Sequence, residues 1–414
     1  MCFIRWNKKQ AASMRALFVH SHSFGVDSDG TAYSPGKLPY SAWSRYLKHA
    51  DQLVVLARCH PREQSDRDLS SGPRVEFDWL PALNRPLAYL REMRRTRNII
   101  RRQVEQSDAV IVRLSPQGWI AAEEACRLNR PWAVEMVGDP WDSYWQIGGW
   151  KGKLYAPFAW LQARRGLSRA PFAIYVTQKT LQRRYPCPNV VSSVSNVQIP
   201  DHNPGILEAR LNFISIRNPN RPIVIGMIGA LNQAYKGHET AMAALKLALA
   251  KQPLLRLQFI GEGHPERWLR MARQLGLENR VAFLGTLQSG SPVREWLDTI
   301  DLYIQPSYTE GLPRALVEAM SRGCPALASS AGGIPELLAG ECLHRPGDHR
   351  TLARQIIAMI AEAERQRESA ARNFSVAGAY AEALLTEKRS MFWQQFFTQA
   401  ARNSTMQTNP SGKD

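Results

Sequence analysis

The sequence contains no run of about 18 consecutive apolar residues, which is the length that a helix needs to cross a bilayer. Its first residues, MCFIRWNKKQAAS, lack the apolar core of a secretory signal. None of the six cysteines forms a CxxC pair or lies near histidines at the spacing of metal ligands. We therefore expect a cytoplasmic protein with reduced thiols and no metal site, in which residues 1–13 are a disordered extension.

The charge of the chain is strongly positive and unevenly distributed. The formal net charge is +17, which favours a partner of negative charge. Residues 14–200 hold 26 Lys and Arg against 16 Asp and Glu, whereas residues 221–375 hold 18 against 15. No nucleic-acid-binding motif accompanies this excess, so nucleic acid is not an expected partner.

Two interpretations of the most basic segment stay open. Residues 85–103, RPLAYLREMRRTRNIIRRQ, hold seven arginines. They predict either a solvated helix face or a surface that attracts anionic lipid headgroups. Residues 155–167, YAPFAWLQARRGL, add aromatic side chains near basic ones. We therefore expect an anionic membrane surface as a partner, touched at the membrane periphery without insertion.

The length of 414 residues exceeds one typical domain, and an apolar fraction of 44% is sufficient for two cores. Buried strands alternate with helical stretches in both halves, which predicts βαβ units and parallel sheets. The predicted strands cover residues 15–20, 52–57, 108–114, 131–138 and 172–177 in the first half, and 222–229, 255–261, 281–285, 302–307 and 325–329 in the second. Residues 21–39, rich in Ser, Asp, Gly and Pro, are predicted as a loop. The fold class is therefore α/β, with two Rossmann-like domains facing a central cleft.

The domain boundaries follow from breaks in this alternation. We predict an N-terminal domain over residues 14–205, a linker over 206–220 and a C-terminal domain over 221–375. Residues 376–402 are predicted as a helix that packs back on the first domain, because its apolar side chains need burial. Residues 403–414 are polar and are expected to form a disordered tail.

The most informative motif is TEGLPRALVEAMSRGCPALASSAGGIPELL, residues 309–338. Glu310 follows a predicted strand, and Gly311, Leu312 and Pro313 begin the next helix. The free N–H groups at that helix end suit a diphosphate. Glu318 lies about two turns further on, where a carboxylate can accept hydrogen bonds from the two hydroxyls of a ribose.

This segment resembles the donor-binding motif of the family-4 retaining glycosyltransferases, which have the GT-B fold. The resemblance extends over residues 222–350 and includes MIGALNQAYKGHETAMAAL (227–245) and DLYIQPSYTEG (301–311). It implies that Glu310 contacts the transferred sugar and that Glu318 binds the nucleotide ribose. It also implies retention of anomeric configuration without a metal or other cofactor, since the nucleotide sugar is itself the substrate.

The resemblance implies further roles around the same motif. Within the pattern that begins at Gly229, Lys236 corresponds to the lysine that binds the diphosphate. Many members of the family carry an arginine directly after that glycine as a second phosphate cation, but here the position is Ala230. Arg314 is a candidate replacement. Gly261, in FIGEGH, is either a cleft-lining residue or part of a tight turn.

The resemblance implies that the C-terminal domain binds the nucleotide sugar and the N-terminal domain the acceptor. The N-terminal half matches the family less well, and two residues there are candidates. Gly36, in the segment SPGK, occupies the place of a glycine loop that lets backbone approach the donor phosphates. Asp139 follows the predicted strand 131–138, and the resemblance implies a carboxylate near the anomeric carbon in this region. The alternative for Asp139 is a loop cap, and Asp142 is the second choice.

Together these features predict a hexosyltransferase that uses a nucleotide diphosphate sugar as donor. The predicted acceptor is a growing, lipid-linked saccharide of a cell-surface polysaccharide or lipopolysaccharide. Two alternatives stay open, a GT-B transferase that acts on a soluble acceptor and a non-catalytic protein that binds nucleotide sugars. The basic first half argues against the former, and the joint presence of Glu310, Glu318 and Lys236 argues against the latter.

Overall fold

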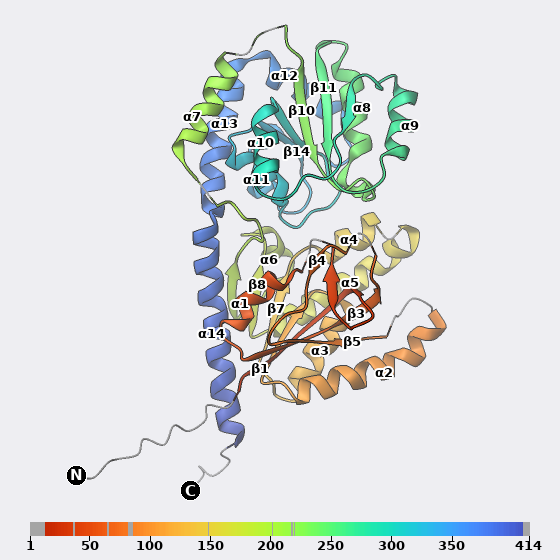
Figure 1. Ribbon diagram of the computed structural model, residues 1–414, viewed down its shortest axis with the longest axis vertical. Helices are drawn as coiled ribbons and strands as arrows, with labels where there is room; N and C mark the ends of the chain where they lie inside the picture. The colour runs from red at the N-terminus through yellow and green to blue at the C-terminus, as the bar shows by residue number, and fades with distance from the viewer. Residues whose placement is uncertain are drawn as a thin grey trace, which may run out of the picture.

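The structure is a computed structural model that describes residues 13–408, except 36–37, 64–65, 82–85, 148, 201, 217 and 219. Two domains, each built on a mainly parallel sheet, are stacked along the long axis of the molecule (Figure 1). The last helix runs along the side of the first domain (Figure 1). The predicted fold class, α/β with two Rossmann-like domains, is confirmed.

The sheet of the first domain has its parallel strands in the order β5-β3-β1-β6-β7-β8-β9. The short strand β2 pairs antiparallel with the end of β1, and β4 pairs antiparallel with β2. Its strands are β1 (Arg15–Val26), β2 (Ala32–Ser34), β3 (Gln52–Pro61), β4 (Asp68–Leu69), β5 (Val75–Trp79), β6 (Ala109–Arg113), β7 (Trp132–Met136), β8 (Phe172–Tyr175) and β9 (Val190–Ser193). The strand order reverses between β1 and β6, which makes this the topological switch point of the sheet.

The first strand is longer than predicted, and part of the predicted loop 21–39 is strand. β1 continues to Val26 because it stays paired with β3 beyond a register shift between Val19 and Ser23. Its far end then pairs with β2, where Gly25 lies opposite Tyr33. Polar residues such as Ser21 and Ser23 occupy this extension, so composition alone indicated a loop.

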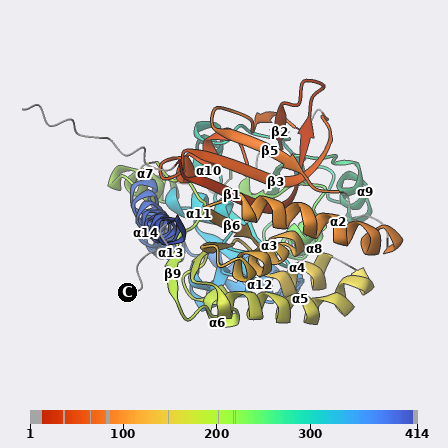
Figure 2. The same ribbon diagram turned by 90° about the horizontal axis from the view of Figure 1, so that it is seen from below.

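The helices of the first domain pack on the two faces of its sheet. They are α1 (Ser44–Leu47), α2 (Pro86–Glu105), α3 (Pro116–Arg127), α4 (Pro140–Ile147), α5 (Gly149–Arg169) and α6 (Thr180–Arg184), with a 3-10 turn η1 at Tyr40–Trp43. None of the helices in the described ranges is long and apolar enough to cross a membrane. Seen from below, α5 lies at the periphery of the molecule (Figure 2).

The second domain repeats this architecture in a simpler form. Its parallel sheet has the order β12-β11-β10-β13-β14-β15, with the switch point between β10 and β13. The strands are β10 (Ile223–Ile228), β11 (Leu255–Ile260), β12 (Val281–Phe283), β13 (Leu302–Gln305), β14 (Ala326–Ser329) and β15 (Leu343–His344). The helical segments are η2 (Ala234–Lys236), α8 (His238–Ala248), α9 (Glu266–Leu275), α10 (Ser291–Thr299), α11 (Arg314–Ser321), η3 (Ile334–Glu336), η4 (Gly340–Cys342), α12 (His349–Ala361) and α13 (Ala363–Ala377).

The segment predicted as a linker contains a helix, α7 (Pro204–Ser215), which packs on α13 of the second domain. Asn203 caps this helix, since its side chain accepts a hydrogen bond from the N–H group of Gly205 at 2.9 Å, and Pro204 occupies the first helical position. Arg210 is buried and donates hydrogen bonds to the carbonyl groups of Leu297, Ile300 and Arg322. The Asn and Pro that interrupt the sequence pattern therefore begin a helix.

The last helix, α14 (Glu382–Thr408), follows the 3-10 turn η5 (Gly378–Tyr380) and lies against the first domain. Its aromatic side chains are buried there: the ring of Phe396 lies 5.3 Å from that of Phe172, and the ring of Trp393 lies 4.9 Å from that of Tyr46. The first and the last described segments, β1 and α14, thus belong to the same domain. α14 also extends beyond residue 403, where the predicted tail begins.

We expect Phe396→Ala to lower the free energy of unfolding by about 3–5 kcal/mol, because it removes a fully buried ring and leaves a cavity. Met391→Ala is the matched control, since Met391 lies on the same helix with more than half of its side chain exposed, and its effect should stay within about 0.5 kcal/mol. Urea unfolding followed by tryptophan fluorescence measures both. Equal effects of the two changes would show that α14 does not pack as described.

Candidate active site

The carboxyl ends of the two sheets face each other across the domain boundary. Gly311, after β13, lies so close to the first domain that a Cβ atom on it would be 2.5 Å from the carbonyl oxygen of Val137, directly after β7. A Cβ atom on Gly333 would likewise be 2.8 Å from the methyl group of Thr177. Ligands of open α/β sheets bind beyond the carboxyl ends of the strands, at the switch point. The geometry therefore places the candidate site beside β10 and β13.

Three hydrogen-bond donors converge on one carboxylate oxygen at this point. The Nζ atom of Lys236 lies 2.9 Å from Oε1 of Glu310, the hydroxyl of Ser307 lies 2.7 Å from it, and Nε2 of Gln305 lies 3.2 Å from it. The side chains of Lys236 and Glu310 are only 19% and 8% exposed. No described residue donates a hydrogen bond to Oε2 of Glu310. The carboxylate is thus held firmly by one oxygen while the other is available to a ligand.

Lys236 reaches Glu310 because the backbone after it takes an unusual course. Gly237 has a φ of +86°, and a Cβ atom on it would lie 2.1 Å from the carbonyl oxygen of Pro306. Only glycine adopts this conformation and fits this space. The loop after β10 is thereby pressed against the end of β13, and the lysine and the glutamate meet.

Gly229 and Gly261, two of the glycines predicted to bind the donor, lie in close contact with neighbouring loops of the protein. A Cβ atom on Gly261 would lie 2.1 Å from the carbonyl oxygen of Gly229, so the segments after β10 and β11 are in backbone contact. A Cβ atom on Gly229 would lie 3.2 Å from the Cβ atom of Lys236. Both glycines therefore set the position of Lys236. Gly36, the third predicted glycine, lies outside the described residues.

The beginning of α11 combines free N–H groups with buried side chains. Pro313 precedes the helix and no side chain caps it. Leu312 and Pro313 are buried. Arg314, the first residue of the helix, is exposed. This helix end has the unpaired donors that an anion requires.

Glu318 lies on α11 beyond this helix end, and its environment disfavours the charged form. Burial raises the pKa of the Glu318 carboxyl, while the nearby cations of Arg314 and Arg294 act in the opposite direction. Arg294 belongs to α10 and was not singled out from the sequence. Together the two arginines supply positive charge near Glu318.

Asp139 is embedded in a hydrogen-bond network. The hydroxyl of Tyr185 donates to Oδ1 at 2.5 Å, and Arg184 binds Oδ2 at 2.6 Å and also contacts Asp142 at 3.1 Å. The Asp139 side chain is 2% exposed, and Oδ1 also accepts from the N–H group of Asp142 at the start of α4. In this conformation Asp139 therefore acts as a helix cap and ion-pair partner. Contact with a sugar requires this network to open.

A contact that the sequence did not indicate joins the two domains. The carboxylate of Glu336, on η3, accepts hydrogen bonds from the N–H groups of residues 178, 179 and 180 at the beginning of α6, at 2.7, 3.0 and 2.5 Å. α6 lacks a side-chain cap of its own. The second domain thus supplies the acceptor for a helix end of the first, which holds the two domains together beside the candidate site.

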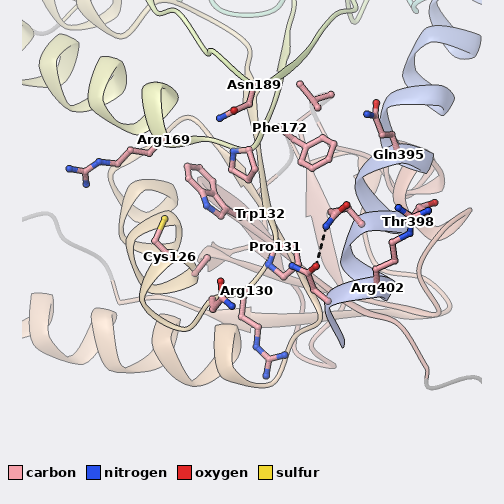
Figure 3. Close-up of a pocket in the computed structure, with 16 residues that line it drawn as sticks. Cys126, Arg130, Pro131, Trp132, Arg169, Phe172, Asn189, Gln395, Thr398 and Arg402 are labelled. Carbon is pink, nitrogen blue, oxygen red and sulfur yellow. Dashed lines mark hydrogen bonds between the residues drawn. The ribbon is translucent and has the colours of Figure 1, made fainter. Parts of the chain in front are cut away.

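A hollow of about 880 Å³ elsewhere in the first domain is a different feature (Figure 3). It lies between α14 and the residues where β7 and β8 begin, among them Trp132 and Phe172. These are the amino ends of the strands, whereas substrates of this architecture bind at the carboxyl ends. We therefore do not assign the hollow to the substrate.

We expect Glu318→Gln to make the protein more stable at pH 7. Burial raises the folded-state pKa of Glu318, so folding favours the protonated carboxyl. This contribution to the free energy of unfolding is fully present below the unfolded-state pKa of about 4.3, and it is lost as the pH rises through the raised folded-state pKa. Glutamine does not ionise, so the variant keeps its stability as the pH rises. The difference in the free energy of unfolding between Glu318→Gln and the wild type should disappear near pH 3.5. Urea unfolding at both pH values measures it.

The control for this experiment is Glu295→Gln, because Glu295 is exposed on α10. Its stability should stay within about 0.5 kcal/mol of the wild type at both pH values. A Glu318→Gln variant that is less stable than the wild type at pH 7 would contradict the assignment of a desolvated carboxylate.

Comparisons with known proteins agree on one family. Residues 222–362 match the family described as glycosyl transferases group 1. The protein CapJ of Staphylococcus aureus is 31% identical over 364 residues, which cover 87% of this chain and 90% of CapJ. A putative colanic acid biosynthesis glycosyltransferase, WcaL of Escherichia coli, is 30% identical over 182 residues, 42% of this chain and 43% of WcaL. The structure of HepE of Anabaena in complex with UDP-glucose superposes with a TM-score of 0.59 and 17% identity, over 95% of this chain and 99% of that one.

Proposed function

The chain belongs to the glycosyl transferases group 1 family, and from this premise we propose that it is a retaining, metal-independent hexosyltransferase. In this proposal the donor is a nucleotide diphosphate sugar. The acceptor is a growing, lipid-linked saccharide of a cell-surface polysaccharide or lipopolysaccharide. The convergence of Lys236, Ser307 and Gln305 on one oxygen of Glu310 carries the proposal, because it fixes a carboxylate and an ammonium at the switch point of the sheet.

The donor diphosphate is proposed to bind between Lys236 and the beginning of α11. Negative charge grows on the departing diphosphate as the bond to the sugar breaks. The Lys236 ammonium and the N–H groups after Pro313 stabilise that charge electrostatically, and they are positioned before the reaction begins. In HepE, a structural neighbour, the bound ligand is UDP-glucose. That observation supports a nucleotide sugar as the donor here.

The two glutamates are proposed to bind different parts of the donor. The free Oε2 atom of Glu310 contacts the transferred sugar, whose ring acquires positive charge during transfer. Glu318 accepts hydrogen bonds from the ribose hydroxyls. The acceptor hydroxyl attacks the face that the diphosphate leaves, and its proton passes to the departing phosphate oxygen, so that the anomeric configuration is retained.

The acceptor and the location of the reaction are the finer part of the proposal. The positive charge of the first domain favours an anionic membrane surface as a partner. WcaL, a relative over part of the chain, is a putative glycosyltransferase of colanic acid biosynthesis. We place the reaction at the cytoplasmic face of the membrane, with the enzyme at the periphery. The contacts at Gly311 and Glu336 close one side of the cleft, which limits hydrolysis of the donor by water.

A panel of nucleotide sugars tests the donor. A ligand that binds only the folded protein raises its stability, by about 2.7 kcal/mol at a hundredfold excess over its Kd. We expect at least one nucleotide diphosphate sugar to raise the melting temperature. Glu318→Ala should weaken its binding by about tenfold or more, since a hydrogen bond to a charged group contributes about 1.5–3 kcal/mol. A panel without any shift, together with no sugar transfer to membrane extract, would refute the proposed function.

Glu310→Ala tests the chemical step. We expect kcat to fall by about tenfold or more with a nearly unchanged donor Kd, because the contact is stronger in the transition state than in the ground state. Glu278→Ala is the control, since Glu278 is exposed before β12, at the opposite end of the sheet. A folded Glu310→Ala variant that transfers sugar at the wild-type rate would exclude Glu310 from catalysis.

A further inference from the structure

Helix α5 has two apolar faces, and only one of them is packed against the protein. Its buried residues are small or apolar: Gly152, Ala156, Ala159, Ala163 and Leu167. The other face carries Trp150, Leu154, Phe158 and Leu161, which are 70%, 73%, 55% and 37% exposed. These four residues, called here the α5 stripe, are spaced by four, four and three positions, so they share one side of the helix.

The α5 stripe lies on the outside of the molecule. α5 forms the outer edge of the first domain when the molecule is viewed from below (Figure 2). Trp145, on the neighbouring helix α4, adds another exposed aromatic ring. A contiguous set of large exposed apolar side chains marks a surface that binds another apolar surface.

The charge around the α5 stripe has a single sign. Lys151, Lys153, Arg164, Arg165 and Arg169 are all exposed, and none of them forms an ion pair with a described residue. The sequence has no acidic residue between Asp142 and Asp201. The ammonium of Lys151 lies 5.6 Å from the ring centre of Trp150, and that of Lys153 lies 5.8 Å from that of Trp145. Cations are thus interleaved with the apolar residues.

The basic helix α2 differs in this respect, because many of its arginines are neutralised. Arg97 pairs with Glu123 and Glu124 of α3, and Arg101 pairs with Glu105 at 2.9 Å. Arg102 lies 4.0 Å from Asp78. Of the two interpretations of residues 85–103, these pairs favour a solvated helix face.

We propose that the α5 stripe is the surface by which the protein docks on an anionic lipid bilayer. The apolar side chains enter the interfacial region, and the flanking cations contact the headgroups, the arrangement of a helix that lies in the membrane plane. A second copy of this chain does not fit the same surface, since a twofold contact through α5 would bring its unpaired cations against the same cations of the copy. An anionic surface is the complementary partner.

The consequence of membrane docking for access to the acceptor rests on the proposed function. α4 begins at Pro140, close after Val137, which faces Gly311 across the domain boundary. The helical hairpin of α4 and α5 therefore begins at the edge of the candidate site. A protein docked by the α5 stripe holds that rim near the bilayer, where the saccharide of a lipid-linked acceptor is found.

The test is sedimentation of the full chain with vesicles of phosphatidylcholine alone or with one third phosphatidylglycerol. The wild type should bind the anionic vesicles preferentially. Leu154→Gln/Phe158→Gln should weaken this binding by about tenfold or more, and Lys151→Gln/Lys153→Gln should reduce the preference for anionic lipid. All four residues are exposed, so neither variant should lose stability in a thermal melt.

Two matched controls complete the experiment. Leu247→Gln/Leu269→Gln replaces two leucines that are 45% and 43% exposed on the second domain, and Arg101→Gln/Arg102→Gln removes two charges from α2. Both should bind vesicles like the wild type. Any of four results would overturn the inference. The α5 variants could bind vesicles like the wild type, or the α2 variant could lose binding. The wild type could fail to bind vesicles, or it could form a dimer that the Leu154→Gln/Phe158→Gln variant abolishes. Donor binding measured by thermal shift in the same variants separates this outcome from a failure of the proposed function.

Discussion

At Gly237 the backbone passes so close to Pro306 that no side chain fits between them. The candidate site depends on this approach. It joins the loop after β10 to the end of β13, the two strands at the switch point, and it brings the Lys236 ammonium to 2.9 Å from Glu310. Two charges that are mostly removed from water need hydrogen-bonding partners, and Ser307 and Gln305 supply them. A close backbone contact thus positions a buried ammonium and a carboxylate beside each other at the switch point.

The relation between the two domains depends on backbone contacts in the same way. Gly311 and Gly333 allow the second domain to approach the first, and Glu336 accepts three N–H groups at the beginning of α6. On the far side, α14 returns the chain to the first domain and buries its aromatic face there (Figure 1). The two domains are therefore joined beside the site by specific hydrogen bonds to Glu336, whereas α14 is attached to the first domain by aromatic packing.

The unpaired positive charge of the first domain is concentrated on one side, at α5. The arginines of α2 are largely paired with acidic side chains, whereas the cations of α5 have no ionic partner among the described residues and surround exposed apolar side chains. Net charge alone does not distinguish these two helices. The difference arises from acidic side chains of α2, α3 and β5 that lie beside the arginines of α2, whereas the sequence of α5 has no acidic residue. The unpaired charge therefore lies on the side of the molecule where α4 and α5 leave the rim of the candidate site.

The sequence by itself determined the two parallel sheets, since alternation of strands and helices is a local pattern. It also determined Glu310 and Glu318 as candidates, since a strand end followed closely by a helix start is local too. The tertiary structure alone decided the rest. Asn203 and Pro204 interrupt the alternation of strands and helices in the sequence, but they begin helix α7. Asn and Pro are common in loops and also at the start of helices, so the residue types alone do not distinguish the two. Asp139 follows a strand end as predicted, yet Tyr185 and Arg184, more than 40 positions away, occupy its carboxylate. Which face of α5 stays exposed likewise depends on what packs against it, because burial is a relation between segments far apart in the chain.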